Sequence, residues 1–166
     1  MLFRSGEIME YKNILVPFDG SKHAMSAVKA ALGLVKGSED SKLTILHVVS
    51  MSVAPTISES DPVIGSTPTY IDYLDYANLY DDSLSKKRDK MIKEITAAFP
   101  DMPAAQVEYD AIAHPSPVQA IVDYCKNHQC DMIVMGRRGL GAIRASFGSV
   151  SSGVLRSTDL PVLTVK

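Results

Sequence analysis

The sequence contains no tryptophan and only two cysteines among its 166 residues. Cys125 and Cys130 stand close together without further ligands at zinc-site spacing, so we expect two small buried side chains in a reducing compartment. No run approaches the roughly 20 apolar residues of a membrane-spanning helix. The formal net charge of −2 gives no general attraction to nucleic acid or to an anionic membrane surface. We therefore expect neither as a partner.

The rest of the composition is that of an ordinary globular protein. With 46% hydrophobic and 22% charged residues, the chain can bury a substantial core as a single domain. Residues Met1 to Ile8 are too short and too polar for a signal peptide, and Met9 begins what looks like a domain start. We expect a poorly ordered extension at 1–10, one domain at 11–166 and a cytoplasmic location.

Short apolar runs alternate with helical patterns along the chain. The runs at 12–17, 42–49 and 132–135 are continuously apolar, which is typical of parallel strands covered on both faces. The segment 106–113 alternates between apolar and polar residues and predicts a strand nearer an edge, and 160–165 predicts a closing strand. This alternation predicts an α/β fold, a doubly wound parallel sheet with helices on both faces.

The predicted helices have start and stop signals. Ser21 can cap the first helix and Gly37 can end it, whereas Ser116 and Pro117 form the start of a later one. A last helix is expected at 149–157. The expected apolar stripes are Ala24, Val28, Ala31 and Val35; Leu84, Met91, Ile95 and Ala98; and Val118, Ile121, Val122 and Cys125.

The stretch 51–82 differs from the rest of the chain. Its first half is rich in Ser, Pro and Thr and predicts a long loop. Its second half places Tyr70, Tyr73, Tyr76 and Tyr80 on one face of a helix. This face could pack on the sheet or on a partner subunit, or it could cover a ligand as an aromatic lid. The residues do not decide between these interpretations.

A glycine-rich segment follows the fourth predicted strand, and Gly148-Ser149 opens the last helix. Glycines let backbone N–H groups approach an anion, and a helix N-terminus adds partial positive charge, so this pattern predicts a phosphate site. It is no P-loop, because Ala142 stands where the lysine would be, and no dinucleotide fingerprint, because Arg144 replaces the last glycine. A G-x-S-x-G elbow is excluded by Val150.

In an open parallel sheet, ligands bind beyond the carboxyl ends of the strands, where the strand order reverses. If the first and fourth strands are neighbours there, Asp19 faces the glycine segment. The four histidines have no metal-ligand spacing, and His114, at the end of the third predicted strand, is either structural or in contact with ligand. No nucleophile–base pair is evident. The residues indicate an anion-binding site with a carboxylate opposite and no assigned catalytic residue.

The chain resembles the universal stress protein family over nearly all of 11–166. The resemblance lies in the segments Asn13–Ser21, His47-Val48, Asp131–Gly139, Gly148–Ser151 and Leu160–Lys166. It implies a Rossmann-like, five-stranded parallel sheet of order 3-2-1-4-5 and, as in some members, ATP bound in the crevice.

The resemblance also implies a set of binding residues. Gly136, Gly139, Gly148 and Ser149 would line the phosphates, Pro17, Phe18 and Asp19 would meet the base and ribose, and Val48 would offer backbone contacts. Met135 and Val150 complete the expected site, and Mg²⁺ could accompany the phosphates. Arg137 and Arg138 could bind phosphate or be a solvated pair. The family motif G-x2-G-x9-G-[S/T] is one residue short here, because only eight residues, 140–147, separate Gly139 from Gly148.

The terminal strand predicts an assembly. Val162, Leu163 and Val165 would form an exposed apolar edge, and the resemblance implies a homodimer through 160–166. The functional expectation is a dimeric ATP-binding sensor or regulator of the stress response. Two alternatives stay open: a dimeric interaction module that has lost nucleotide binding, and a slow ATP hydrolase. Any enzymatic activity is expected to be weak ATP hydrolysis at most.

Overall fold

A computed structural model describes residues 11–50, 71–140 and 147–166, with the backbone alone described for 71–80. The expected N-terminal extension, residues 1–10, lies outside the described residues, as do 51–70 and 141–146.

The strands form an all-parallel sheet of order β3-β2-β1-β4-β5. The strand bounds are β1 (Asn13–Pro17), β2 (Lys42–Ser50), β3 (Val107–His114), β4 (Met132–Gly136) and β5 (Val162–Val165). This confirms the expected fold class and strand order. β1 pairs with both β2 and β4, so the strand order reverses at β1 and β4.

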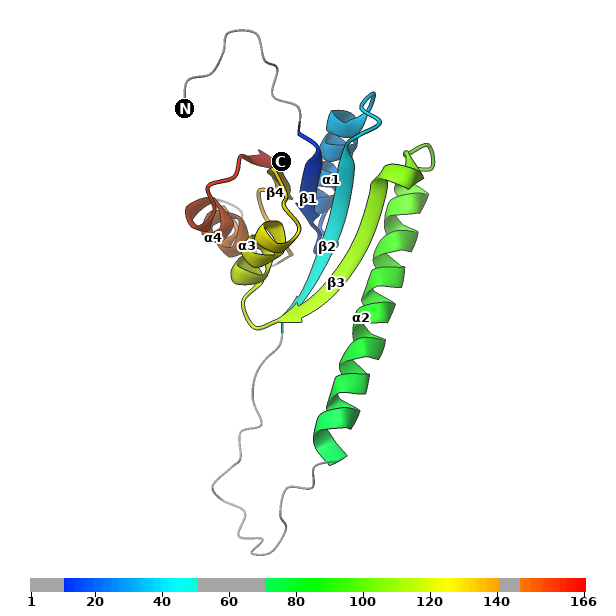
Figure 1. Cartoon of the computed structure of the whole chain (residues 1–166), viewed down its shortest axis with the longest axis vertical. Coiled ribbons are helices and arrows are strands. Elements are labelled where there is room, and N and C mark those ends of the chain that lie inside the picture. Colours follow the sequence, from blue (N-terminus) through cyan, green and yellow to red (C-terminus); the bar gives the residue numbers. More distant parts are fainter. Residues whose placement is uncertain (1–10, 51–70, 141–146) are drawn as a thin grey trace, which may run out of the picture.

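Helices cover both faces of this sheet (Figure 1). Their bounds are α1 (Lys22–Val35), α2 (Ile71–Ala98), α3 (Pro117–Asn127) and α4 (Ser149–Ser157), with a 3₁₀ turn η1 (Ala104–Gln106) before β3. Ile14 and Val16 pack in a core with α1 and α2, whereas Leu15 packs in a second core with α3 and α4. Because both faces of β1 are buried, its sequence is continuously apolar.

The predicted helix signals are confirmed in the structure. The Ser21 hydroxyl accepts a hydrogen bond from Ala24 N at 3.1 Å, and the Ser116 hydroxyl accepts one from Gln119 N at 3.3 Å. Gly37 follows α1 with φ +93°, a left-handed conformation that glycine adopts without strain. These caps determine where α1 and α3 begin, at the carboxyl ends of β1 and β3.

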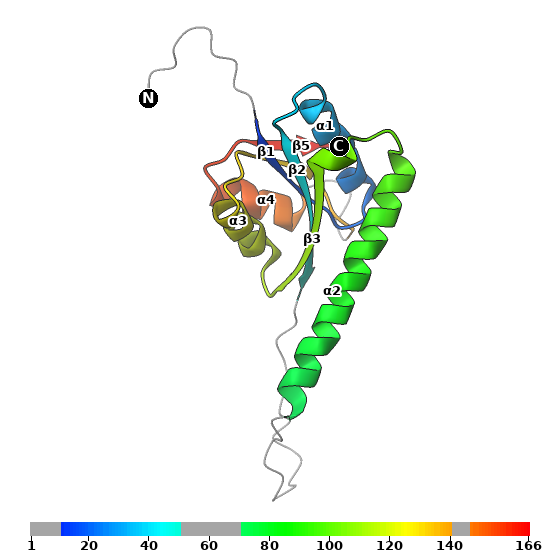
Figure 2. The same ribbon diagram turned by 45° about the vertical axis from the view of Figure 1, so that its right-hand side comes forward.

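Helix α2 runs along β3 and extends beyond the end of that strand (Figures 1 and 2). It begins at Ile71, so the second half of the stretch 51–82 is helical, as the tyrosine spacing predicts. Met91 and Ile95 of the predicted stripe are buried in the core, but its last member, Ala98, is exposed, because it is the last residue of α2. The packing of the tyrosine face lies outside the described residues.

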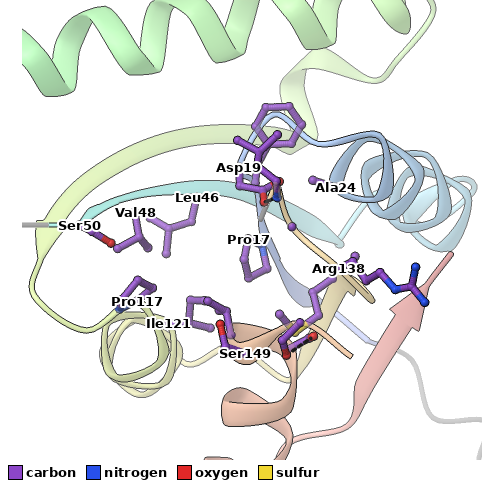
Figure 3. A pocket seen from close by; sticks show the side chains of 18 of the residues that line it. Pro17, Asp19, Ala24, Leu46, Val48, Ser50, Pro117, Ile121, Arg138 and Ser149 are labelled. Atoms are coloured by element: carbon purple, nitrogen blue, oxygen red, sulfur yellow. Dashed lines mark hydrogen bonds between the residues drawn. The ribbon is translucent and has the colours of Figure 1, made fainter. Parts of the chain in front are cut away.

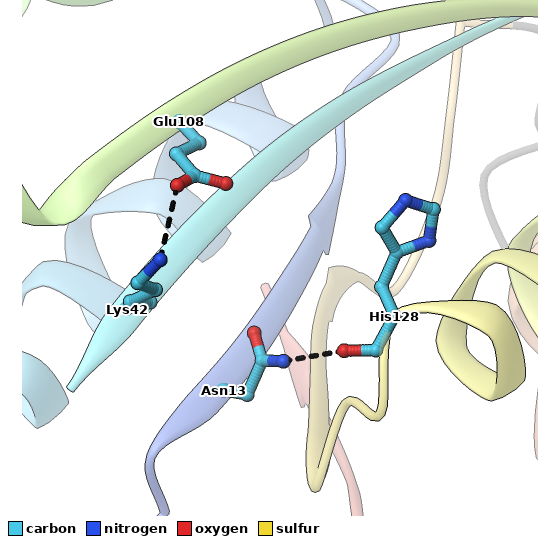
Figure 4. Close-up of polar contacts among 4 residues, drawn as sticks. All are labelled: Asn13, Lys42, Glu108 and His128. Carbon is cyan, nitrogen blue, oxygen red and sulfur yellow. Dashed lines mark hydrogen bonds and ion pairs between the residues drawn. The ribbon is translucent and has the colours of Figure 1, made fainter.

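Polar contacts tie the amino end of β1 to the segment before β4. Asn13 Nδ2 donates to the carbonyl oxygen of His128 at 2.6 Å (Figure 4), and the Asp131 carboxylate accepts from Lys12 N at 2.7 Å. The exposed Lys42–Glu108 ion pair of 3.3 Å links β2 and β3 and contributes little stability in water. The first two contacts hold β1 beside β4, where the strand order reverses.

Both cysteines are buried and unpaired by disulfides, as expected. A hydrogen bond to Cys130, together with burial, raises the pKa of the Cys125 thiol. Among the described residues, no helix is both long and apolar enough to cross a bilayer.

Candidate functional site

A pocket of about 610 Å³ opens at the carboxyl ends of β1, β2 and β4, where the strand order reverses. Its volume lies within the usual range for small-molecule sites, about 300–1,000 Å³. All predicted site residues except Arg137 line it: Pro17, Phe18, Asp19, Val48, Met135, Gly136, Arg138, Gly139, Gly148, Ser149 and Val150.

One end of the pocket is apolar. Figure 3 shows Leu46, Val48 and Ser50 along β2 facing Pro117 and Ile121 of α3. Of these, only Val48 was predicted from the sequence as a site residue. Two signals could have identified others: Leu46 lies two residues before Val48 on the same side of the strand, and Pro117 begins the helix after the third strand.

Val48 is paired with Ile112 of β3 on one side, but no described strand pairs with it on the side that faces β1 and the pocket. β1 ends at Pro17, opposite Leu46, whereas β2 continues to Ser50. The carbonyl oxygen of Leu46 accepts from Phe18 N at 2.8 Å and so marks the edge of β2 that faces β1. Because backbone directions alternate with a period of two, the N–H and C=O of Val48 lie on this edge. A donor and an acceptor therefore stand side by side at the apolar end.

The other end of the pocket is formed by backbone amides at the start of α4. Gly148 is the N-cap residue, and no side chain of the described residues caps this helix. Gly148 N donates to the carbonyl oxygen of Arg137 at 3.0 Å, and the Ser151 hydroxyl donates to the same oxygen at 2.8 Å. These bonds hold the helix start against the end of β4 and leave first-turn amides directed at the pocket.

Two glycines of the predicted motif lie in close contact with other parts of the protein, and the contact of Gly136 is with backbone. A Cβ on Gly136 would lie 2.7 Å from the backbone carbon of His23 and 2.9 Å from Ala24 N, inside the first turn of α1. A Cβ on Gly139 would overlap Asp19 Oδ2. The backbone contact requires glycine at 136, whereas a side chain at 139 would have to displace the Asp19 carboxylate.

Asp19 meets the glycine segment, as the predicted topology implies. Its Oδ1 accepts from Ser21 N at 2.9 Å and its Oδ2 accepts from Leu140 N at 3.2 Å. The Ser21 hydroxyl also donates to the carbonyl oxygen of Arg138, at 3.5 Å. The loop after β1 and the loop after β4 are thus linked across the mouth of the pocket.

The two arginines lie in different places. Arg137 is outside the pocket lining, with its guanidinium carbon 5.9 Å from the centre of the Phe147 ring and its backbone N donating to Val165 O at 2.7 Å. Arg138 lines the pocket, and its guanidinium extends away from the apolar side chains (Figure 3). The backbone of Arg137, through its bonds with Val165 O and Gly148 N, therefore holds the segment that precedes α4 in place.

Histidines contribute structure at this edge of the sheet. His114 Nδ1 lies 3.0 Å from Ser116 N and 2.8 Å from the carbonyl oxygen of Ser116, and His114 is absent from the pocket lining. His47 Nδ1 lies 2.8 Å from the carbonyl oxygen of Phe18. Among the described residues, no group of three or more His, Cys, Asp and Glu could hold a metal ion.

A doubly wound parallel sheet with a pocket at its switch point places the chain in the class of Rossmann-like α/β proteins. Residues 10–166 match the universal stress protein family, and the chain belongs to that family.

Individual relatives match almost the whole chain. Universal stress protein MJ0531 of Methanocaldococcus jannaschii is 29% identical over 166 residues, covering 99% of this chain and 87% of the relative. The structure of UspA from Lactobacillus plantarum superposes with a TM-score of 0.70 at 25% identity, covering 96% of this chain and all of the other. A universal stress protein in complex with cAMP superposes with a TM-score of 0.57 at 23% identity, covering 95% and 98%.

Proposed function

We propose that the pocket binds an adenine nucleotide, ATP, and that the protein acts as a dimeric nucleotide-dependent sensor or regulator in the stress response. The observation that carries this proposal is the contrast between the two ends of one pocket. At one end lie apolar side chains and the backbone N–H and C=O of Val48, which no described strand pairs with on the β1 side. At the other end lie the amides that begin α4, which no described side chain caps. A nucleotide has the same two ends, a flat base and an anionic phosphate chain.

The apolar end suits a purine base. Val48 and Pro117 offer partly exposed apolar surface on facing walls, where Leu46 and Ile121 are buried beside them, and a flat ring can pack against these walls. The C=O of Val48 can accept from the exocyclic amine of adenine, and its N–H can donate to the adjacent ring nitrogen. Guanine presents an acceptor where adenine presents that amine, so it would leave the carbonyl unpaired. The pairing therefore favours adenine.

The amide end suits phosphate. The start of α4 combines first-turn N–H groups, the Ser149 hydroxyl and the positive end of the helix dipole. The missing residue of the family motif falls in 140–147, yet the Arg137–Gly148 bond still closes this segment. Mg²⁺, if it accompanies ATP, would be held mainly by phosphate oxygens. The proposal assigns no catalytic residue.

The direct test is to denature the purified protein and identify any released nucleotide by mass spectrometry, followed by calorimetric titration of the nucleotide-free protein with ATP and Mg²⁺. We expect released adenine nucleotide or saturable binding of ATP with weaker binding of GTP. Absence of both signals would instead support an interaction module that has lost nucleotide binding.

Val48→Pro should weaken ATP binding about tenfold or more, because it removes the pocket-facing N–H while the β2–β3 hydrogen bonds use the neighbouring residues. Val48→Ala is the matched control, since it loses side-chain volume but keeps the N–H, and it should weaken binding only a fewfold. Titration calorimetry of both variants checks this. Equal affinities of the two variants would remove the Val48 backbone from the site.

We also propose a homodimer through residues 160–166. Among the described strands, β5 pairs with β4 alone, and Leu163 on it is 37% exposed, so an apolar strand edge is open to a second copy. Leu163→Glu should convert a dimer into a monomer by placing like charges at the interface. Thr96→Glu, on α2 at the opposite edge of the sheet, is the charge-matched control. Light scattering after size exclusion measures both, and a wild-type monomer at micromolar concentration would contradict the proposal.

A further inference from the structure

Asp19 already occupies a backbone amide of the glycine segment. Its Oδ2 accepts from Leu140 N at 3.2 Å, while its Oδ1 accepts from Ser21 N at 2.9 Å. Between these partners, the carboxylate lies so close to Gly139 that any side chain there would overlap Oδ2. The pocket therefore contains an anion of its own at the place where the sequence motif predicts phosphate.

A ligand phosphate and the Asp19 carboxylate compete for this place. Two anions cannot both accept from one N–H at close range without repelling each other, even where the bond is exposed to water. Among the described lining residues, Asp19 and Arg138 carry the charged side chains, so the lining has no excess of cations to hold both anions. One of the two anions must give up the Leu140 amide.

We propose that Asp19 is a displaceable internal anion, which holds the Leu140 amide in the free protein and leaves it when a nucleotide phosphate arrives. This inference rests on the proposed nucleotide function and adds a selection rule to the same site. Its movement can be local, because Oδ1 keeps Ser21 N as a partner and the Ser21–Arg138 contact of 3.5 Å does not involve the carboxylate.

The consequence is discrimination against free anions. Inorganic phosphate or pyrophosphate would have to displace the carboxylate using phosphate contacts alone. A nucleotide adds the contacts of its base at Val48 and the apolar walls, and the freed carboxylate can then accept from a ribose hydroxyl. Asp19 thereby restricts the amides to ligands that carry both a base and a phosphate.

The test measures pyrophosphate and adenosine binding by the full chain without divalent cations, by ³¹P NMR and calorimetry. Asp19→Ala should bind pyrophosphate about tenfold more tightly than wild type, because one charge-assisted hydrogen bond no longer competes. Adenosine, which has no phosphate, should bind no more tightly. Asp101→Ala removes one negative charge from an exposed turn after α2 and should leave both affinities unchanged.

A second variant tests whether Asp19→Ala acts only by destabilising the start of α1. Asp19→Asn keeps the size of the side chain and an acceptor for Ser21 N, and it should also tighten pyrophosphate binding while its thermal unfolding stays near that of wild type. If both variants bind pyrophosphate no more tightly than wild type while wild type still binds ATP, Asp19 only stabilises the loop. That result would overturn the inference about Asp19 and leave the proposed function standing. If wild type binds no ATP, the proposed function falls, whereas tighter pyrophosphate binding by Asp19→Ala would still establish the internal anion.

Discussion

Replacing Gly136 with alanine should lower the free energy of unfolding by about 3 kcal/mol. The added Cβ would lie 2.7 Å from the backbone carbon of His23 and 2.9 Å from Ala24 N. Backbone atoms inside the first turn of a helix cannot rotate away as a side chain can. Either α1 or the end of β4 must shift, and both belong to the buried core around β1. Urea denaturation gives the change through the midpoint at constant slope.

Gly33→Ala is the matched control for this prediction. Gly33 lies within α1, and a Cβ there would have no heavy atom within 4 Å. Alanine should therefore raise stability by about 0.5–1 kcal/mol, because it restricts the unfolded chain and favours helix. Similar stability of the two variants would mean that the contact between β4 and α1 does not exclude a side chain at position 136.

This contact changes how the glycine motif is interpreted. Gly136 is required by helix packing, and Gly139 lies against the Asp19 carboxylate, so neither position alone demonstrates a phosphate ligand. A substitution at Gly136 would also remove binding by disturbing the fold. The backbone N–H of Val48 and the carboxylate of Asp19 are better probes, because changing them adds no atom at the contact between β4 and α1.

The fold was predictable from local patterns. Continuously apolar runs indicated strands buried on both faces, and cap residues such as Ser21 and Ser116 indicated where helices begin, because both signals depend on near neighbours in the chain. The family resemblance supplied the strand order, which periodicity does not contain. The switch point and the general position of the pocket followed from that order.

The finer geometry of the site was not predictable, because it depends on contacts between distant segments. The open backbone edge at Val48 arises because β2 extends past the end of β1, which depends on strand length and register. The bond from Leu140 N to Asp19 spans 121 positions of the chain. Arg137 and Arg138 are adjacent and chemically identical, yet one packs over Phe147 and the other lines the pocket. Their positions differ because the two side chains leave the end of β4 in different directions.

Leu15→Ala and Ile14→Ala should each cost about 2–5 kcal/mol of stability but should differ in ligand binding. Both side chains are fully buried on β1, so each truncation leaves a cavity in the core. Leu15 belongs to the core with Leu46 and Met135, which line the pocket, whereas Ile14 belongs to the core with α1 and α2 on the other face.

Relaxation into a cavity at Leu15 would therefore move the pocket wall and weaken ATP binding about three- to tenfold. A cavity at Ile14 should leave the wall in place and the affinity near that of wild type. Urea denaturation establishes that the two losses of stability are comparable, and calorimetric titration at a temperature where both variants are folded compares their affinities. Equal loss of affinity in both variants would mean that binding follows global stability, and that the α3–α4 face of the sheet has no special part in shaping the site.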